Sequence, residues 1–288
     1  MSLDKFVDQC NEASFLPDDL ELQVAAKDYL SGRRMPVVKT GWPAHDGNFG
    51  LLWGQITAIG GYANYGKGTF IRQMMLQISL SENVNSAIWC PEDMPVEYAY
   101  MDLVNTYTGL NTEKPKQYDF IGDKRGMEMF HFIRERFFII DSVKWKETSL
   151  DSILTAFDKL YNEYGCRLFL IDPYKDIDQD SMVRDDFRVH DNIKKMRKFV
   201  QGKKAHLFVV LHLKSPTAKS GEDPKIPTYN DLHYGSEWSK SLDNLLFWHH
   251  ETFFSDRMKP ERILAISKCK KRKIQGMSER FDMEWDWF

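Results

Sequence analysis

A glycine-rich stretch near the end of the first quarter of the chain carries the clearest chemistry. Residues 61–69 read Gly-Tyr-Ala-Asn-Tyr-Gly-Lys-Gly-Thr, which contains the pattern G-x-x-x-x-G-K of a phosphate-binding loop. A β-prone run at 55–60 precedes it, and a run with helical apolar spacing follows. In that setting backbone N–H groups and a helix N-terminus converge on phosphate oxygens, and the lysine reaches the β- and γ-phosphates. The sequence therefore predicts a nucleoside triphosphate site; the alternative is a glycine turn before a core helix. The residues expected to contact the nucleotide are Gly61, Asn64, Tyr65, Gly66, Lys67, Gly68, Thr69 and Phe70.

One position of this loop departs from the usual pattern. The residue after the lysine is ordinarily a Ser or Thr whose hydroxyl holds Mg²⁺, but here it is Gly68, and Thr69 follows one position later. We expect ATP or another NTP to bind together with Mg²⁺, with Thr69 as the metal ligand of the loop. If Thr69 cannot replace the missing hydroxyl, hydrolysis should be slow. The alternative is that the backbone at position 68 has a positive φ, which only glycine adopts without strain.

Two carboxylates follow the strand-like run 86–90. Glu92 and Asp93 come immediately after it and before Pro95. In an open parallel sheet, ligands bind beyond the carboxyl ends of the strands, so either acid could activate the water that attacks a γ-phosphate. Glu92 is the expected base and Asp93 the other candidate. Helix capping by the two acids is the structural alternative.

Two further strand-like runs end in polar groups. Asp172 closes the strand-like run 167–171, whose last four residues are apolar, a pattern expected to place a carboxylate in the Mg²⁺ shell. His212 closes the run 206–211, where its imidazole could hydrogen-bond a γ-phosphate oxygen and report hydrolysis to the following loop. A histidine at a strand end can also be an ordinary polar terminus.

The only dense basic run lies at 267–273, Ser-Lys-Cys-Lys-Lys-Arg-Lys. Lys270 and Arg272 are the candidates for a cation that acts on the nucleotide of a neighbouring subunit. The alternatives are a solvated edge, a localisation signal or a phosphate contact to nucleic acid.

The elements that must position these residues alternate along the chain. Near-continuous apolar strands between helices predict an α/β fold with a mostly parallel central sheet flanked by helices. The last two strands lack an intervening helix and should form an antiparallel edge, and the polar stretch 214–231 should be a mobile loop. Strands are expected at 55–60, 86–90, 136–140, 167–171, 206–211, 244–248 and 262–267, and helices at 68–81, 95–109, 123–134, 149–164 and 187–202.

Composition narrows the class of protein. The 288 residues are 42% hydrophobic and 14% aromatic, which supports a sizeable core. A net charge of -3 argues against a protein that coats nucleic acid, though not against one that grips it locally. No run is apolar enough for a membrane span and no signal peptide is evident, so we expect a cytoplasmic protein without membrane partners. The scattered Cys10, Cys90, Cys166 and Cys269 are expected to be reduced thiols.

Taken in order, these segments resemble the RecA-like ATPase domain of DnaB-family helicases, and most of all the Twinkle-like and phage primase-helicase branch. The resemblance covers roughly residues 38–287 and implies a RecA-like P-loop NTPase core at 36–288. The residue pattern before it predicts an N-terminal helical arm at 1–35, which we expect to pack on a neighbour. The segments that carry it are 41–54, 66–73, 90–95, 171–174, 191–193, 212–216 and 231–236.

The same resemblance implies a hexameric, nucleotide-driven translocase on single-stranded DNA, with a separate primase or loader as a further partner. Loops near 173–186 and 214–236 would line the channel, and DNA contacts are expected from Lys214, Lys219, Lys225 and Gly235. Two positions depart from the family pattern. Gly68 lacks the metal-binding hydroxyl, and the trans-acting arginine has no clean match, since Lys270 cannot form its bidentate contacts.

Two functions fit the sequence. The first is a replicative-type DNA helicase of phage or mobile-element type without a fused primase, which the resemblance would place in the cytoplasm of a bacterium or phage-infected cell. The second is an assembly protein of the same fold that binds ATP and hydrolyses it weakly or not at all, which Gly68 and the missing arginine favour. A small-molecule kinase would need an acceptor pocket and a lid that the sequence does not display.

Overall fold

The computed structural model describes residues 23, 27, 38, 40, 51–108, 124–178, 184–214, 222–256, 259–270 and 277–282. The chain divides into two compact units, Met1–Val37 and Val38–Phe288. In the first unit Gln23 and Lys27 are helical, and the rest of the expected arm lies outside the described residues. The strands and helices described below belong to the second unit.

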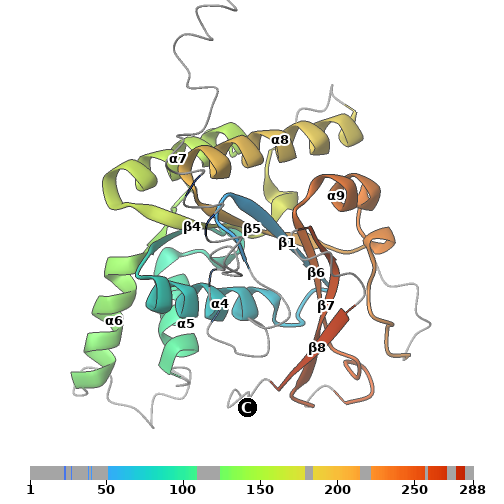
Figure 1. Cartoon of the computed structure of the whole chain (residues 1–288). Helices are drawn as coiled ribbons and strands as arrows, with labels where there is room; N and C mark the ends of the chain where they lie inside the picture. The colour runs from blue at the N-terminus through green and yellow to red at the C-terminus, as the bar shows by residue number, and fades with distance from the viewer. Residues whose placement is uncertain are drawn as a thin grey trace, which may run out of the picture. The chain divides into compact units, whose positions relative to one another are not determined.

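A single eight-stranded sheet forms the centre of the second unit (Figure 1). Its order is β3-β2-β4-β5-β1-β6-β7-β8, in which the strands from β3 to β6 pair in parallel and β7 and β8 continue antiparallel. The predicted parallel sheet with an antiparallel C-terminal edge is therefore confirmed. The strands are β1 Gln55–Gly61, β2 Asn85–Trp89, β3 Phe137–Ile139, β4 Cys166–Ile171, β5 His206–His212, β6 Asn244–His249, β7 Glu261–Cys269 and β8 Met277–Asp282.

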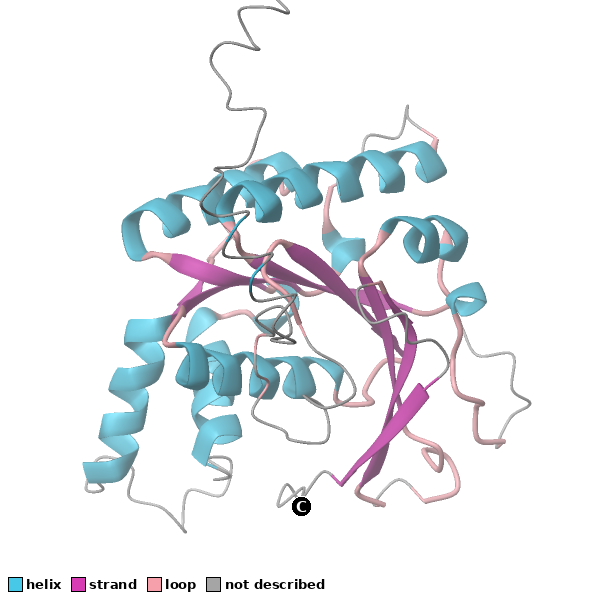
Figure 2. Ribbon diagram, in the orientation of Figure 1, coloured by secondary structure: helices cyan, strands magenta, loops and turns pink. Residues whose placement is uncertain are grey.

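Helices cover both faces of the sheet (Figures 1 and 2). On one face α4, α5 and α6 pack against residues such as Ile59 and Val210; on the other, α7, α8 and α9 pack against residues such as Ala58 and Val209. Consecutive strand residues thus enter opposite cores, because side chains alternate along a strand. The helices are α4 Lys67–Glu82, α5 Val96–Thr108, α6 Lys124–Arg136, α7 Leu150–Tyr164, α8 Asp185–Lys203 and α9 Gly235–Ser241.

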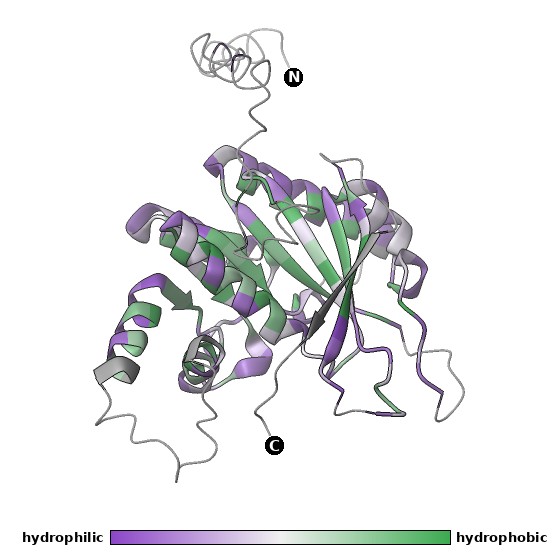
Figure 3. Cartoon of the chain, turned by 60° about the horizontal axis from the view of Figure 1, so that its bottom comes forward, coloured by the Kyte–Doolittle hydropathy of each residue, from purple (hydrophilic) through white to green (hydrophobic). Residues whose placement is uncertain are grey.

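Burial on both faces explains the strand sequences. β1, β4 and β6 are buried along almost their whole length, and β5 is buried up to its last residue. Figure 3 shows the strands as mainly hydrophobic, whereas the helices carry both hydrophobic and hydrophilic positions. Strands covered on both faces need continuous apolar runs, which is the pattern that the sequence displays.

Two elements were not expected from the sequence. α9 has seven residues and only one large apolar side chain that is buried, Trp238. β8 pairs with β7 at the edge of the sheet, and its sequence Met-Ser-Glu-Arg-Phe-Asp has no apolar run. Part of the stretch expected to be a mobile loop is also ordered, because Thr228 and Asp231 form a reciprocal capping box around a short 3₁₀ turn. Residues 215–221 of that stretch lie outside the described residues.

Two smaller expectations can also be compared with the structure. Cys90, Cys166 and Cys269 are buried free thiols, whereas Cys10 lies outside the described residues. None of the helices that the structure describes is both long and apolar enough to cross a membrane.

Candidate nucleotide site

The register of the sheet brings the predicted site residues together at the carboxyl ends of the central strands. Gly61 at the end of β1 lies opposite His212 at the end of β5. Ile171, which precedes Asp172, pairs with both β5 and β2, and the chain continues from β2 to Glu92. The carboxyl ends of neighbouring parallel strands thus place the phosphate loop, both acids and the histidine along one rim.

The phosphate loop connects β1 to α4 and is held from behind by aromatic rings. Gly66 has φ 81°, a left-handed conformation that glycine adopts without strain, and α4 begins at Lys67. The Trp248 Nε1–H donates to the Tyr65 carbonyl at 2.8 Å, and the Trp248 ring stacks on Phe70 with centroids 4.1 Å apart. Tyr65 is itself buried, with its ring centroid 4.3 Å from that of Phe253. These contacts fix the loop backbone, whereas Asn64 is exposed at the tip.

Lys67 is almost fully buried and lies across Gly61. A Cβ at position 61 would come within 2.7 Å of the Lys67 Cδ and of the Trp248 carbonyl, so only glycine leaves room for the lysine stem. The Lys67 ammonium donates to the Tyr62 carbonyl at 2.6 Å. Burial lowers the pKa of Lys67 to about 8, although Asp172 and Glu92 act in the opposite direction. Lys67 is therefore a desolvated cation close to two carboxylates.

Gly68 lies in the first turn of α4 and does not have a positive φ. The expectation that backbone conformation requires a glycine here is therefore wrong. The constraint is a close approach instead: a Cβ at position 68 would be 3.2 Å from the Asp172 Oδ2 and 3.7 Å from the Arg72 Nη2. A small side chain there would need a shift of a few tenths of an ångström in its neighbours.

The residues present do not fit a Mg²⁺ ion held by the protein. Asp172 offers one buried carboxylate at the end of β4, and Gly68 offers no ligand. Thr69 is rotated by about 100° from position 68 around the helix axis, so its hydroxyl does not take the direction of a side chain at 68. Arg72 supplies a cation beside the same carboxylate.

Burial and nearby cations shift the pKa of Asp172 in opposite directions. Burial raises the pKa of its carboxyl, and the nearby Arg72 and Lys67 act to lower it. Mutual neutralisation with these cations is what keeps a carboxylate acceptable at a buried strand end.

The structure separates the two candidate bases by their partners. Asp93 is bound by the Arg72 guanidinium and accepts from the Cys90 thiol at 3.1 Å, so it is turned toward α4. The Glu92 side chain is 45% exposed, and its carboxylate pairs with Lys175 at 2.8 Å. Glu92 is consequently the acid that a bound water could reach, whereas Asp93 has a structural partner.

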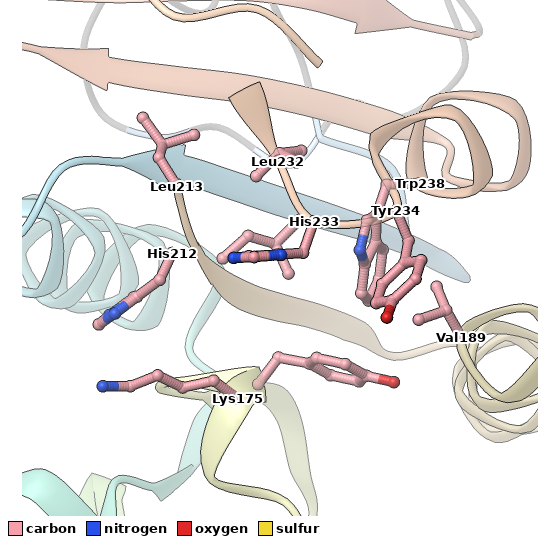
Figure 4. A pocket seen from close by; sticks show the side chains of 10 residues that line it. Lys175, Val189, His212, Leu213, Leu232, His233, Tyr234 and Trp238 are labelled. Atoms are coloured by element: carbon pink, nitrogen blue, oxygen red, sulfur yellow. The ribbon is translucent and has the colours of Figure 1, made fainter. Parts of the chain in front are cut away.

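His212 and Lys175 lie on the same side of a cavity of about 410 Å³ beyond β4 and β5. Figure 4 shows both side chains extending in one direction, with Tyr234 and Trp238 on the other side of the cavity. Burial, together with the charges of Lys67 and Lys175, lowers the pKa of His212 to about 4. The imidazole is therefore neutral at pH 7 and can donate one hydrogen bond.

Lys270 lies near the amino end of β6, whereas the predicted phosphate loop lies at the carboxyl end of β1. Its backbone N–H donates to the Asp243 carbonyl at 3.0 Å and its ammonium is 3.6 Å from the Asp243 carboxylate. Asp243 in turn accepts from the backbone N–H of Ile56 at 3.2 Å, next to the first residue of β1. The length of β1 separates these amino ends from Gly61 by roughly 20 Å, at about 3.3 Å per residue. Lys270 cannot touch the phosphate loop of its own chain, and Arg272 lies outside the described residues.

The expected DNA contacts are only partly described. Lys214 and Lys225 are exposed, Lys214 donates to the Asn230 carbonyl at 3.2 Å, and Lys219 lies outside the described residues. Gly235 is buried, and a Cβ there would collide with the Tyr229 carbonyl. Close packing thus explains the glycine, whatever its relation to DNA.

The sheet order and the converging strand ends give this chain a fold similar to that of RecA-like ATPase domains of DnaB-like replicative helicases. One solved structure, an "ATPase Domain", matches with a TM-score of 0.71 and 14% identity, covering 92% of this chain and 94% of that chain. Another, "The Structure Of A DnaB-Like Replicative Helicase And Its Interactions With Primase", has a TM-score of 0.69 and 14% identity, covering 96% and 68%. At these identities the likeness concerns the fold.

A sequence relative points the same way. The "Twinkle homolog protein, chloroplastic/mitochondrial" of Arabidopsis thaliana is 22% identical over 227 residues, which is 74% of this chain and 30% of that protein. The chain thus spans less than a third of that relative's length. No family model matches the chain. The resemblance expected from the sequence, to DnaB-type ATPase domains with a Twinkle-like relation, is confirmed.

Arg72 and Lys175 belong to the site but were not predicted. Gly68 and Arg72 are four residues apart on one helix and therefore share a face, which is a usable sequence signal. Lys175 follows Asp172 by three residues, and only the fold reveals its pairing with Glu92.

Proposed function

We propose that this chain is the ATPase domain of a DnaB-type DNA helicase, which assembles into rings and uses ATP or another NTP to move along single-stranded DNA. The observation that supports this is the convergence of Lys67, Glu92, Asp172 and His212 at one rim of a sheet with this fold. A separate primase or loader would be a further partner.

Each of these residues would have one role in the reaction. Lys67 and the backbone N–H groups of the loop would hold the β- and γ-phosphates. Glu92 would accept a proton from the attacking water. The water oxygen would bond to the γ-phosphorus while the bond between that phosphorus and the β–γ bridging oxygen breaks. The neutral imidazole of His212 would donate a hydrogen bond to a γ-phosphate oxygen and lose it when phosphate leaves.

Lys175 would hold Glu92 in the nucleotide-free state. The hydrogen bond to Glu92 raises the pKa of Lys175, and Lys175 also borders the cavity beside His212. A DNA phosphate that attracts Lys175 would release Glu92, which would link DNA binding to hydrolysis.

Removing this partner should make hydrolysis less dependent on DNA. We expect Lys175→Met to raise ATP turnover without DNA by about two- to fivefold, the effect of losing one exposed ion pair, and to reduce stimulation by DNA. Steady-state turnover with and without oligo-dT measures this. The matched control is Lys194→Met, at an exposed lysine of α8 that pairs with Asp191. A fall in DNA-free turnover would instead mean that Lys175 positions the base.

Lys270 and Arg272 would act on a neighbour's nucleotide. Lys270 lies at the amino ends of the strands, far from the phosphate loop of its own chain, and this separation supports a role between subunits. Lys214, Lys219 and Lys225 would contact DNA phosphates in the channel.

The second candidate is a nucleotide-dependent assembly protein with weak or no hydrolysis. It is favoured by the lack of a metal-binding hydroxyl at Gly68 and by the lack of a clean match for the trans-acting arginine. Both candidates share the phosphate loop and differ in turnover.

Binding of DNA and ring formation test the first candidate. A labelled oligo-dT should bind with ATP and much less without it, as followed by fluorescence anisotropy, and electron microscopy of the same sample should reveal rings. Monomers alone, with no ATP-dependent DNA binding at high protein concentration, would contradict the proposal.

A further inference from the structure

Arg72 places a buried guanidinium directly behind the phosphate loop. It lies on α4 one turn after Gly68 and is only 7% exposed. Its guanidinium pairs with Asp93, lies 3.6 Å from Asp102 and donates to the Cys90 sulfur at 3.8 Å. Contacts from α5 and the segment after β2 thus hold the cation in one orientation.

Gly68 is what opens the space between this guanidinium and Asp172. A side chain at position 68 would point into that space, because its Cβ would lie 3.2 Å from the Asp172 Oδ2 and 3.7 Å from the Arg72 Nη2. With glycine there, position 68 places no side chain between the guanidinium, the carboxylate and the first turn of α4. The first turn of that helix is also where phosphate oxygens bind in a loop of this type.

We propose that Gly68 and Arg72 together adapt this loop to bind a nucleoside triphosphate without a protein-held Mg²⁺, with the guanidinium supplying beside Asp172 the positive charge that the ion would supply. This inference rests on the nucleotide site proposed above. Arginine suits the role because its charge is permanent and its donors pair with phosphate oxygens in a fixed geometry.

The two residues are interdependent. A serine at 68 would add atoms between Asp172 and Arg72 and would bring a hydroxyl of the kind that binds Mg²⁺. A neutral residue at 72 would leave Asp172 and Asp93 without their shared cation. Each change should therefore alter how binding depends on the metal, in different ways.

The test is the affinity for ATP, and for inorganic tripolyphosphate, measured by calorimetry in EDTA and in excess Mg²⁺. For the unaltered protein the two dissociation constants should agree within about threefold. Gly68→Ser should bind at least about tenfold more weakly in EDTA than in Mg²⁺, and Arg72→Gln should lose about tenfold or more in EDTA, the size of one charge-assisted contact. Arg72→Lys should retain part of the metal-free affinity.

Controls separate the inference from the site on which it rests. Arg134→Gln, at an exposed arginine of α6, should bind as the unaltered protein does. If the unaltered protein binds ATP only in Mg²⁺, the inference is overturned and the nucleotide site stands. If it binds ATP in neither condition, the nucleotide site itself fails. Thermal unfolding checks each variant, and if Arg72→Gln does not fold, Gly68→Ser decides the result, because position 68 has no backbone strain.

Discussion

Lys67→Ala is expected to weaken ATP binding by on the order of a hundredfold, because one charged donor to the β- and γ-phosphates contributes about 1.5–3 kcal/mol. The fold should persist. The lost aliphatic contacts over Gly61 are offset by removal of a desolvated cation whose pKa is lowered to about 8. Calorimetry gives the affinity and thermal unfolding the stability. Lys159→Ala, at an exposed lysine of α7, is the matched control.

The affinity should also depend on pH with a definite sign. Only the ammonium form of Lys67 attracts phosphate, and bound phosphate raises the pKa of this group. The Lys67 contribution to affinity should thus be constant below about pH 8 and fall as pH rises above it, by up to about tenfold per pH unit. The dependence should vanish in Lys67→Ala. Equal affinity of the two proteins at pH 7 would remove the phosphate-loop assignment.

Glu92→Gln is expected to lower ATP turnover by about 10²- to 10⁴-fold while ATP remains bound. The amide keeps the shape of the side chain but cannot accept the proton of the attacking water. Turnover and affinity must be measured on the same sample, because only their separation distinguishes a lost base from a lost site.

Asp93→Asn is the matched comparison. Asp93 is paired with Arg72 and hydrogen-bonded to Cys90, so the substitution should lower thermal stability more than turnover. If Asp93→Asn loses turnover and Glu92→Gln does not, the base is Asp93 and the geometric argument for Glu92 is wrong.

Much of the fold was predictable because its strands are buried on both faces. Continuous apolar runs identified the strands β1 to β7, and the glycines around Lys67 identified the loop between β1 and α4. β8 escaped prediction since an edge strand needs only backbone pairing, and its sequence is polar. α9 was missed because seven residues give too short a pattern for helical periodicity.

The part of the candidate site that lies at the ends of strands was predictable from the sequence. Asp172 and His212 could be inferred because parallel strands bring their carboxyl ends together. Arg72 could not be assigned in the same way, since an arginine in a helix is usually solvated and only tertiary packing buries this one against Asp93. The pairing of Lys175 with Glu92 likewise depends on how two separate loops meet.

Steady-state ATP hydrolysis with and without single-stranded DNA tests the central claim most directly, with Glu92→Gln as the blank. A DNA-driven motor should hydrolyse ATP above the blank, and oligo-dT should raise that rate. If ATP is bound but the rate stays at the level of the blank under both conditions, the chain is an ATP-binding assembly protein and the helicase proposal is contradicted.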